Sequence, residues 1–345
     1  MPSSPAFQSI YISEYVAKEE GSYGGGGSLS ASTDGIELWL ESKQPALGTV
    51  GPYLFGGEMG PQLAGLGQRP QVKPAGVPIK APLPFFFRGP LAAYSSSVFW
   101  PGHRILKAAG FDAALTATGG AEKWTYTPTA EGSAITSLVD LLIHRGEEWK
   151  RDGVIGNLKI DAPDAKPPKF TFDSVGRGNA DPVARAIGAL TYGFQSVSIP
   201  LACPAALVFG SYASAVVQSW SFDMGRSYEN FRPDLNAAGY HAGYQPGVRN
   251  PIVVATIEQT ALVGTPFHAS GGINPQKLRE AATAIAFSAQ IGTAQYNRLK
   301  LSCPTVQLVG EPGYTEVNGV ACLQLTFEAK VSAPGANDDF SIVTD

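Results

Sequence analysis

Hydrophobic and polar residues alternate over many short stretches of the chain, a pattern that predicts β-strands rather than long helices. Trp124 and Tyr126 recur with period two, and so do Phe170 and Phe172. Successive side chains on a strand point to opposite faces, so this spacing buries one face and leaves the other polar. Further strands are predicted over 7–16, 36–40, 138–143, 154–160, 218–224, 252–257, 285–291, 299–301 and 323–331.

Two short helices and one tight turn are predicted between these strands. The stretch from Pro101 to Gly110 suits a helix, because proline is favoured in the first helical turn and glycine at the C-terminal end. A second short helix begins at 274–275, an Asn-Pro pair. The Asn-Gly pair at 318–319, flanked by valines, is typical of a type I′ turn between antiparallel strands.

Two segments interrupt the alternation. Residues 45–84 are rich in Gly and Pro but carry few charges and several aromatic residues, so we expect an extended arm that becomes ordered against a neighbouring subunit. Residues 144–153 are charged and bounded by glycines, which predicts a solvated turn.

Membrane insertion and secretion are not expected. Residues 186–222 hold no charged side chain, but Pro200 and Pro204 would break a spanning helix, so a buried linker followed by a strand is expected. Residues 1–21 lack a basic cluster followed by an apolar run, so no signal peptide is expected there.

Composition narrows the class of protein. The 345 residues include 40 Gly and 27 Pro, while charged residues make up 16 % against a usual ~25 %. Hydrophobic residues reach 44 %, enough for a packed core, which excludes general disorder. The many helix breakers disfavour a helical bundle, and the length predicts about two domains. With a net charge of −4, the chain has no basic stripe for tight binding of a nucleic-acid backbone.

No motif for catalysis, cofactor binding or metal binding is present. The sequence lacks GxxxxGK[ST], HExxH, GxSxG and an EF-hand loop, and its 4 histidines show no ligand spacing. We therefore expect no enzyme, no cofactor and no metal site. Cys203, Cys303 and Cys322 form no CxxC pair, so reduced thiols are expected, with a bridge between the last two as the open alternative.

Short matches between the two halves predict a duplicated domain. Residues 157–160 (Asn-Leu-Lys-Ile) are similar to 298–301, and 170–173 (Phe-Thr-Phe-Asp) to 325–328, in the same order and after a short helix in each half. The predicted organisation is a first domain over 1–185 that includes the arm, a linker over 186–206 and a second domain over 207–345.

Several segments resemble the tail tube (major tail) proteins of long-tailed bacteriophages. The resemblance covers most of the chain, although the arm and the linker match poorly. It is carried by 15–24, 85–90, 100–111 and 124–128 in the first half and by 220–225, 252–258 and 337–340 in the second.

The resemblance implies a fold and a function. Each half would be a β-sandwich or half-barrel tube domain with one short α-helix. Three copies would form a ring with pseudo-sixfold symmetry, and stacked rings would form the tube through which DNA is delivered. The implied partners are other copies of the chain, a tape-measure protein, tail-terminator and baseplate or tip proteins, and genomic DNA passing through the lumen. The protein would be made in the host cytoplasm and reside in the virion.

Candidate self-assembly residues lie in two places: Tyr53, Phe55, Phe85, Phe86 and Phe87 in and after the arm, and Glu147, Glu148 and Trp149 in the charged turn. An alternative function is a virion-surface or extracellular β-domain that binds carbohydrate or a receptor, with aromatic residues such as Trp39, Tyr53 and Trp149 lining the site. A hydrolase with an unrecognised site and a membrane pore are weaker alternatives.

Overall fold

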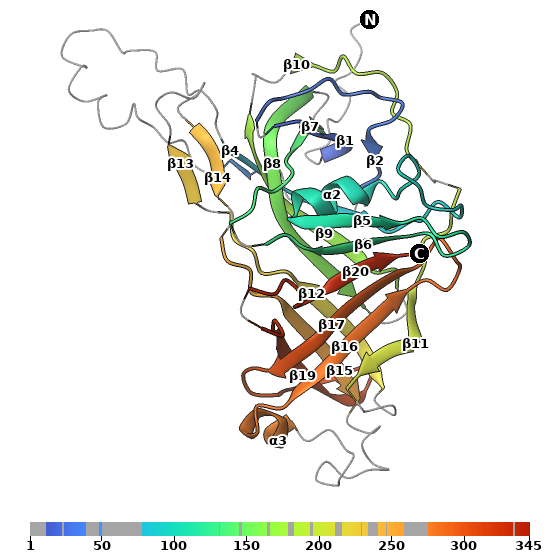
Figure 1. The fold of residues 1–345 in the computed structure, drawn as a ribbon, viewed down its shortest axis with the longest axis vertical. Coiled ribbons are helices and arrows are strands. Elements are labelled where there is room, and N and C mark those ends of the chain that lie inside the picture. The colour runs from blue at the N-terminus through green and yellow to red at the C-terminus, as the bar shows by residue number, and fades with distance from the viewer. Residues whose placement is uncertain are drawn as a thin grey trace, which may run out of the picture.

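A computed structural model describes residues 12–22, 24–38, 48–49, 78–130, 132–144, 147–163, 166–178, 183–193, 196–210, 216–228, 230–233, 241–245, 247–258, 275–333 and 335–345. Within these ranges the chain is mainly β, as predicted: 18 strands join into one sheet, and β13 (Asn230–Pro233) and β14 (His241–Gln245) form a second. Figure 1 shows an elongated molecule, with the first half of the chain in the upper part and most of the second half in the lower part.

In the first half, antiparallel strands pair in the order β3–β4–β9–β8–β7–β1, and β10 lies along the start of β8. Helix α2 follows β4, and a hairpin of β5 and β6 comes before β7. The bounds are β1 Ile12–Glu19, β2 Gly35–Ile36, β3 Gly48–Thr49, β4 Pro78–Phe86, α2 Gly102–Ala108, β5 Phe111–Thr116, β6 Lys123–Pro128, β7 Leu138–His144, β8 Glu147–Ala162, β9 Lys169–Gly178 and β10 Val183–Ala184.

In the second half, antiparallel strands pair in the order β12–β15–β19–β17–β16–β11, and β20 lies along the start of β17. Helix α3 follows β15, and β18 forms a hairpin with β19. The bounds are β11 Ala202–Phe209, β12 Val217–Asp223, β15 Ile252–Glu258, α3 Pro275–Glu280, β16 Ala284–Ile291, β17 Leu299–Leu308, β18 Gly313–Val317, β19 Val320–Ala329 and β20 Ser341–Thr344.

The short sequence matches lie on strands that hold the same place in these two orders. Residues 157–160 are in β8 and 299–301 in β17, which begins one residue after the start of its tetrapeptide, while 170–173 and 325–328 are in β9 and β19. Their pairing differs, however. Leu158 lies opposite Phe172, whereas Phe327 lies opposite Leu308 and not opposite Leu299. The correspondence therefore holds for the order of the strands but not for the register of these tetrapeptides.

The two halves share one sheet and one hydrophobic core. The long strand β8 pairs with β7 near its N-terminal end, while its residues 159–162 pair with β12. Strand β20 pairs with β6 of the first half, as Figure 1 shows. The Phe340 ring lies 4.9 Å from that of Phe222 and 5.5 Å from that of Phe111, so aromatic packing continues across the junction.

The predicted helix and turn are confirmed. Helix α2 runs from Gly102 to Ala108 with Ile105 and Leu106 fully buried, and Gly110 adopts a φ of 92°, a conformation that favours glycine. Asn318 and Gly319 have φ values of 51° and 80° between β18 and β19, as a type I′ turn requires. The second predicted helix is found as α3.

The expectation of a solvated charged turn over 144–153 is wrong. Strand β8 begins at Glu147, and both Arg151 and Asp152 are buried within it. Arg151 lies opposite Asp140 of β7, so the strand register neutralises its charge. Residues 145 and 146 lie outside the described residues.

The expectation of an arm as far as residue 84 is also wrong at its C-terminal end. Strand β4 spans Pro78–Phe86 and pairs with β9 along its whole length. Every second residue from Ile79 to Phe85 is buried, and Pro82 and Pro84 lie at the alternate positions. Proline has no N–H to donate and therefore argues against a strand in a sequence, but it is tolerated in a strand at a sheet margin. The prolines of β4 are the reason that this strand was not predicted. Of the rest of the predicted arm, Gly48 and Thr49 form β3, and residues 45–47 and 50–77 lie outside the described residues.

Several strand boundaries differ from the sequence prediction, and so does the state of two cysteines. The strand predicted over 7–16 is β1 from Ile12, with 7–11 outside the described residues. Of the strand predicted over 36–40, Ile36 belongs to β2, residues 37 and 38 are not in a strand, and residues 39 and 40 lie outside the described residues. Strand β11 begins at Ala202, inside the segment expected as a linker. Cys303 and Cys322 are free, so the alternative of a bridge between them is wrong.

Candidate functional site

The aromatic residues predicted to join copies of the chain mostly lie inside it. Phe85 and Phe87 are each 1 % exposed, with their rings 5.9 and 5.0 Å from that of Trp100. Phe86 points to the other face of β4 and is half-buried, because alternate residues of a strand face opposite ways. Tyr53 and Phe55, like Trp39 of the alternative function, lie outside the described residues.

The three residues of the charged segment lie at the start of β8. Glu147 is exposed and Trp149 is half-buried against the core. Glu148 is 8 % exposed and accepts hydrogen bonds from the backbone N–H groups of Ala186 and Ile187. Glu148 therefore fixes the segment that leaves β10. Of the described candidates, Phe86, Glu147 and Trp149 keep surface for a contact with another copy.

A buried polar network beside β8 went unrecognised in the sequence. The Arg151 guanidinium donates to both Asp140 carboxylate oxygens, at 2.9 and 2.5 Å, and both side chains are fully buried. It also donates to the Ile79 carbonyl at 3.1 Å and to the Ser174 hydroxyl at 2.9 Å. Burial raises the pKa of Asp140, an effect that the adjacent Arg151 opposes. In the sequence, the only indication of this pair was Asp140, the single acidic residue inside the apolar run 138–143, because a buried acid requires a partner such as Arg151.

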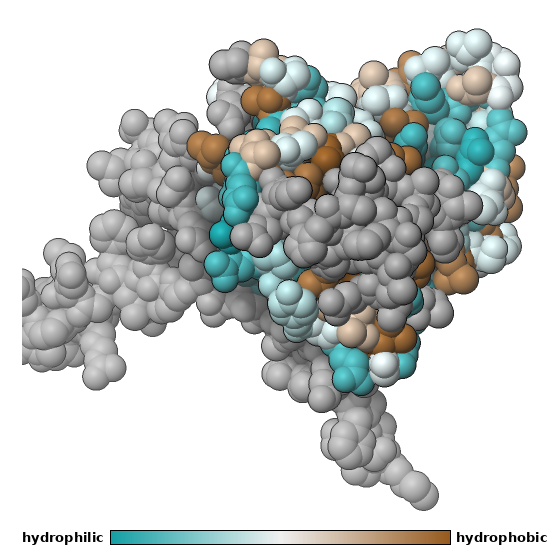
Figure 2. All heavy atoms as spheres, turned by 90° about the horizontal axis from the view of Figure 1, so that it is seen from below, coloured by the Kyte–Doolittle hydropathy of each residue, from teal (hydrophilic) through white to brown (hydrophobic). Residues whose placement is uncertain are grey.

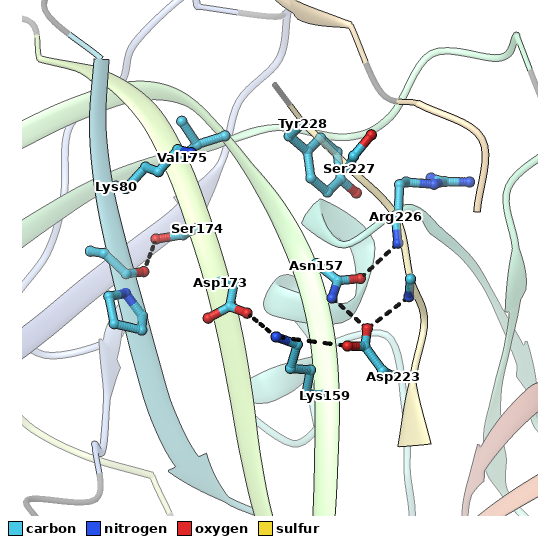
Figure 3. A pocket seen from close by; sticks show the side chains of 13 residues that line it. Lys80, Asn157, Lys159, Asp173, Ser174, Val175, Asp223, Arg226, Ser227 and Tyr228 are labelled. Carbon is cyan, nitrogen blue, oxygen red and sulfur yellow. Dashed lines mark hydrogen bonds and ion pairs between the residues drawn. The ribbon is translucent and has the colours of Figure 1, made fainter. Parts of the chain in front are cut away.

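A surface groove of about 490 Å³ lies where β4, β8 and β9 meet the segment that follows β12. Figure 3 shows Lys159 between two carboxylates, with its Nζ 2.9 Å from Asp173 and 3.7 Å from Asp223. Asn157 donates to Asp223 at 2.7 Å, and its side-chain oxygen accepts the backbone N–H of Arg226. The hydrogen bond to Asp173 raises the pKa of Lys159.

These contacts fix the junction between the halves. Asn157 and Lys159 belong to β8 and Asp223 to β12, so the network ties the second half to the first. The Lys159, Asp173 and Asp223 side chains are about two-fifths exposed, so each ion pair contributes little stability. Both carboxylates are already paired, an arrangement suited to holding strands together.

The sheet has margins without a neighbouring strand in the described part of the chain. Strand β11 pairs with β16 on one side, β18 with β19 and β5 with β6. An unpaired margin presents N–H and C=O groups that can pair with another chain. Strand β4 meets β3 at residues 79–80, and beyond that point Pro82 and Pro84 interrupt its margin.

The β18–β19 ribbon is the most exposed of these margins. All of residues 313–316 are exposed, and Tyr314 retains 79 % of its surface. Val317 and Val320, beside the turn, are half-buried. Seen from below in Figure 2, apolar residues are scattered among polar ones and do not form one broad patch. Exposed apolar residues such as Val208 and Leu201, 45 % and 52 % exposed, lie at and beside β11.

Comparison of the sequence with protein-family models and with curated proteins finds no match. Among the described residues, no group of three or more His, Cys, Asp or Glu side chains is placed to hold a metal ion. No helix in that part of the chain has the length and apolar character needed to cross a bilayer.

Proposed function

We propose that this chain is a structural virion protein, a tail tube subunit that assembles into rings and stacked tubes as a conduit for phage DNA. Each half is proposed to be one tube domain. The supporting observation is the common pairing order, β3–β4–β9–β8–β7–β1 and β12–β15–β19–β17–β16–β11, with a short helix after the second strand and a short strand along the fourth. Two unrelated halves have no reason to share eight elements in order.

The junction within the chain indicates which strand of the first half could join a neighbouring copy. Strand β12 of the second half pairs with the C-terminal part of β8, beyond the end of β7. In the corresponding order, β3 takes the place of β12 and β17 that of β8. Among the described residues, β3 pairs with β4 and has no second partner. Unlike the C-terminal part of β8, however, the end of β17 is already paired, with β16 at residues 306 and 307 and with β19 at 306–308. We therefore propose that β3 of one copy adds to an unpaired margin of the next copy, such as that of β11, which closes a ring of three chains and six similar domains.

The exposed margins supply contacts beyond this junction. The β18–β19 ribbon presents Tyr314 and an unpaired strand edge, and β11 presents another. Free edges favour pairing with a further chain, and a closed ring satisfies them. The predicted arm, now limited to residues before Pro78, is proposed to latch one ring to the next.

The charge of the chain fits passage of DNA without capture. A net charge of −4 supplies no excess of cations for phosphate binding. The proposed partners are other copies, a tape-measure protein, tail-terminator and baseplate or tip proteins, and DNA passing through the lumen. The protein is proposed to be made in the host cytoplasm and to act in the virion, without catalysis.

Sedimentation velocity over a wide concentration range tests the proposal. Assembly predicts a monomer at high dilution, a trimer as concentration rises, and larger species above it. A monomer at every concentration contradicts it. A glycan array probed with the same protein separates the alternative, because binding of a carbohydrate by a stable monomer favours a surface domain.

A further inference from the structure

One face of the sheet continues without interruption across both halves of the chain. On β4, β9, β8, β12, β15 and β19, alternate side chains are buried in the core, and those between them point to the opposite face. Directly opposed partners on that opposite face form two complete rows through the six strands, and we refer to these twelve residues as the shared face. One row is Pro84, Thr171, Lys159, Asp223, Ile252 and Glu328. The other is Phe86, Lys169, Asp161, Ser221, Val254 and Thr326.

The shared face is mostly polar, and both of its lysines lie beside acids. Asp161 is exposed, and the other eleven residues are half-buried. Figure 3 shows Lys159 between Asp173 and Asp223, with its Nζ 2.9 and 3.7 Å from their carboxylate oxygens, while Lys169 is the strand partner of Asp161. A lysine beside a carboxylate attracts phosphate less, because the carboxylate offsets its charge and repels the phosphate.

The outward face of the remaining strands differs in both respects. It is formed by the β5–β6 hairpin together with β20, β17, β16 and β11, and that hairpin has no place in the strand order common to the two halves. Lys300 of β17 is exposed there, opposite Val343 and Gln290, so neither strand partner is an acid. On the shared face, β4 and β9 correspond to β15 and β19 in that order. Three copies in a ring therefore repeat the shared face as six similar units.

We propose that the shared face lines the lumen of the tube and is the surface past which double-stranded DNA moves, an inference that rests on the proposed ring. Six strands from each of three copies place eighteen side by side, and closed barrels of about that number enclose an aqueous channel. At ~4.8 Å between strands and the usual tilt, such a barrel is roughly 35 Å across between backbones, and inward side chains reduce this to roughly 25 Å. That width admits a DNA duplex, and further strands between copies widen it. The paired lysines keep the DNA from being held by its phosphates.

Labelled cysteines in assembled tubes locate the shared face. Ser221→Cys places a thiol at its centre, Thr171→Cys is a second variant in case the first folds poorly, and Thr127→Cys on the exposed side of β6 is the control. Each variant is labelled with a small maleimide-linked gold cluster while dilute and is then assembled with an excess of unlabelled wild type. Electron micrographs should show gold inside the tube wall for the two shared-face variants and at the outer perimeter for Thr127→Cys.

The outcomes separate this proposal from the proposed function. Tubes in which gold from both shared-face variants lies at the outer perimeter, or between stacked rings, overturn the lumen assignment and leave the tube subunit standing. Absence of tubes from the wild type at every concentration overturns the proposed function, and the lumen assignment with it.

Binding of a short DNA duplex to the unassembled protein tests the charge arrangement separately. Asp161→Asn with Asp173→Asn removes carboxylates beside both lysines, and Glu147→Gln with Glu316→Gln removes the same charge from exposed positions outside the shared face. At low salt, fluorescence anisotropy should show at least about tenfold tighter binding by the first double variant, and the difference should fall as salt rises. Equal binding by the two double variants overturns the role given to the paired lysines.

Discussion

At the scale of single residues, the buried charges of β8 decide whether the first half holds together. Arg151 and Asp140 are both 0 % exposed, and the guanidinium also bridges to Ser174, whose hydroxyl donates to the Ala81 carbonyl at 2.6 Å. The pair thus connects β7, β8, β9 and β4. A buried ion pair is costly to break and often replaceable as a unit, since either charge left behind has no compensation.

Removal of one partner should therefore cost more than removal of both. Asp140→Leu and Arg151→Met are each expected to lower the free energy of unfolding by about 3–5 kcal/mol, and the double variant by clearly less than the sum. Urea unfolding of the four proteins in a double-mutant cycle measures this. Additive effects would contradict direct coupling between the two side chains.

His103 on α2 should make stability depend on pH. It is 5 % exposed, its Nδ1 lies 3.0 Å from the Tyr126 hydroxyl, and burial lowers its pKa from 6.5 to about 4. Glu19 opposes this shift, while Lys107 and Arg104 reinforce it. Because the unfolded chain binds the proton more tightly, this contribution is complete above pH 6.5 and is lost as pH falls toward 4.

The expected loss between pH 6.5 and 4 is about 3 kcal/mol from this residue, at 1.36 kcal/mol for each pKa unit. Unfolding by urea at several pH values, compared between wild type and His103→Gln, isolates it from other titrating groups. The variant should show a flatter dependence over this range. Parallel curves would show that His103 is not the responsible group.

The structural role of a single residue was predicted well where local backbone geometry determines it, and poorly where a partner distant in the sequence determines it. Gly110 and Gly319 were identified because a positive φ leaves a local signature. Arg151 was assigned to a turn because Asp140, its partner across the strand pair, is not visible in a local window.

At the scale of elements, the β18–β19 ribbon is the part whose open strand edge and exposed side chains have least explanation in an isolated molecule. Its tight turn fixes the register, with Val317 opposite Val320, so the peptide groups at Tyr314 and Glu316 face the open margin. Tyr314 itself packs little surface within the chain, at 79 % exposed. A contact with another copy would pair the open edge of β18 and bury Tyr314.

Tyr314→Ser should affect assembly without affecting the fold. The change in the free energy of unfolding is expected to be within about 0.5 kcal/mol, because the side chain is exposed. The concentration needed for assembly should rise at least about tenfold, as for loss of a contact worth ~1.4 kcal/mol or more. Val183→Ser, a 53 % exposed residue of β10, is the matched control. Equal assembly of Tyr314→Ser and wild type would remove the ribbon from the proposed interface.

Elements with clear alternation were predicted, and those with unusual composition were not. Strands β6, β9, β16 and β19 follow the period-two pattern that identified them. Strand β4 was assigned to an arm because its prolines conceal buried residues at every second position. A deletion that tests the arm must therefore stop before Pro78, since removal of residues 78–84 would remove most of β4, one of the two strands that pair with β9.

At the scale of the whole molecule, the two halves are alike in topology yet joined as one body. The sequence suggested duplication through tetrapeptides that lie on corresponding strands but in different register. The shared pairing order of the strands is stronger evidence of similarity between the two halves than the matching tetrapeptides are. How β12 joins β8, and how β20 joins β6, could not be predicted, because pairing between distant strands depends on the assembled sheet.

Electron microscopy of the purified protein at high concentration tests the central claim most directly. The account predicts rings whose class averages show threefold symmetry with six similar lobes around an open lumen, and tubes of stacked rings at higher concentration. Images that show only separate elongated particles at every concentration would contradict it.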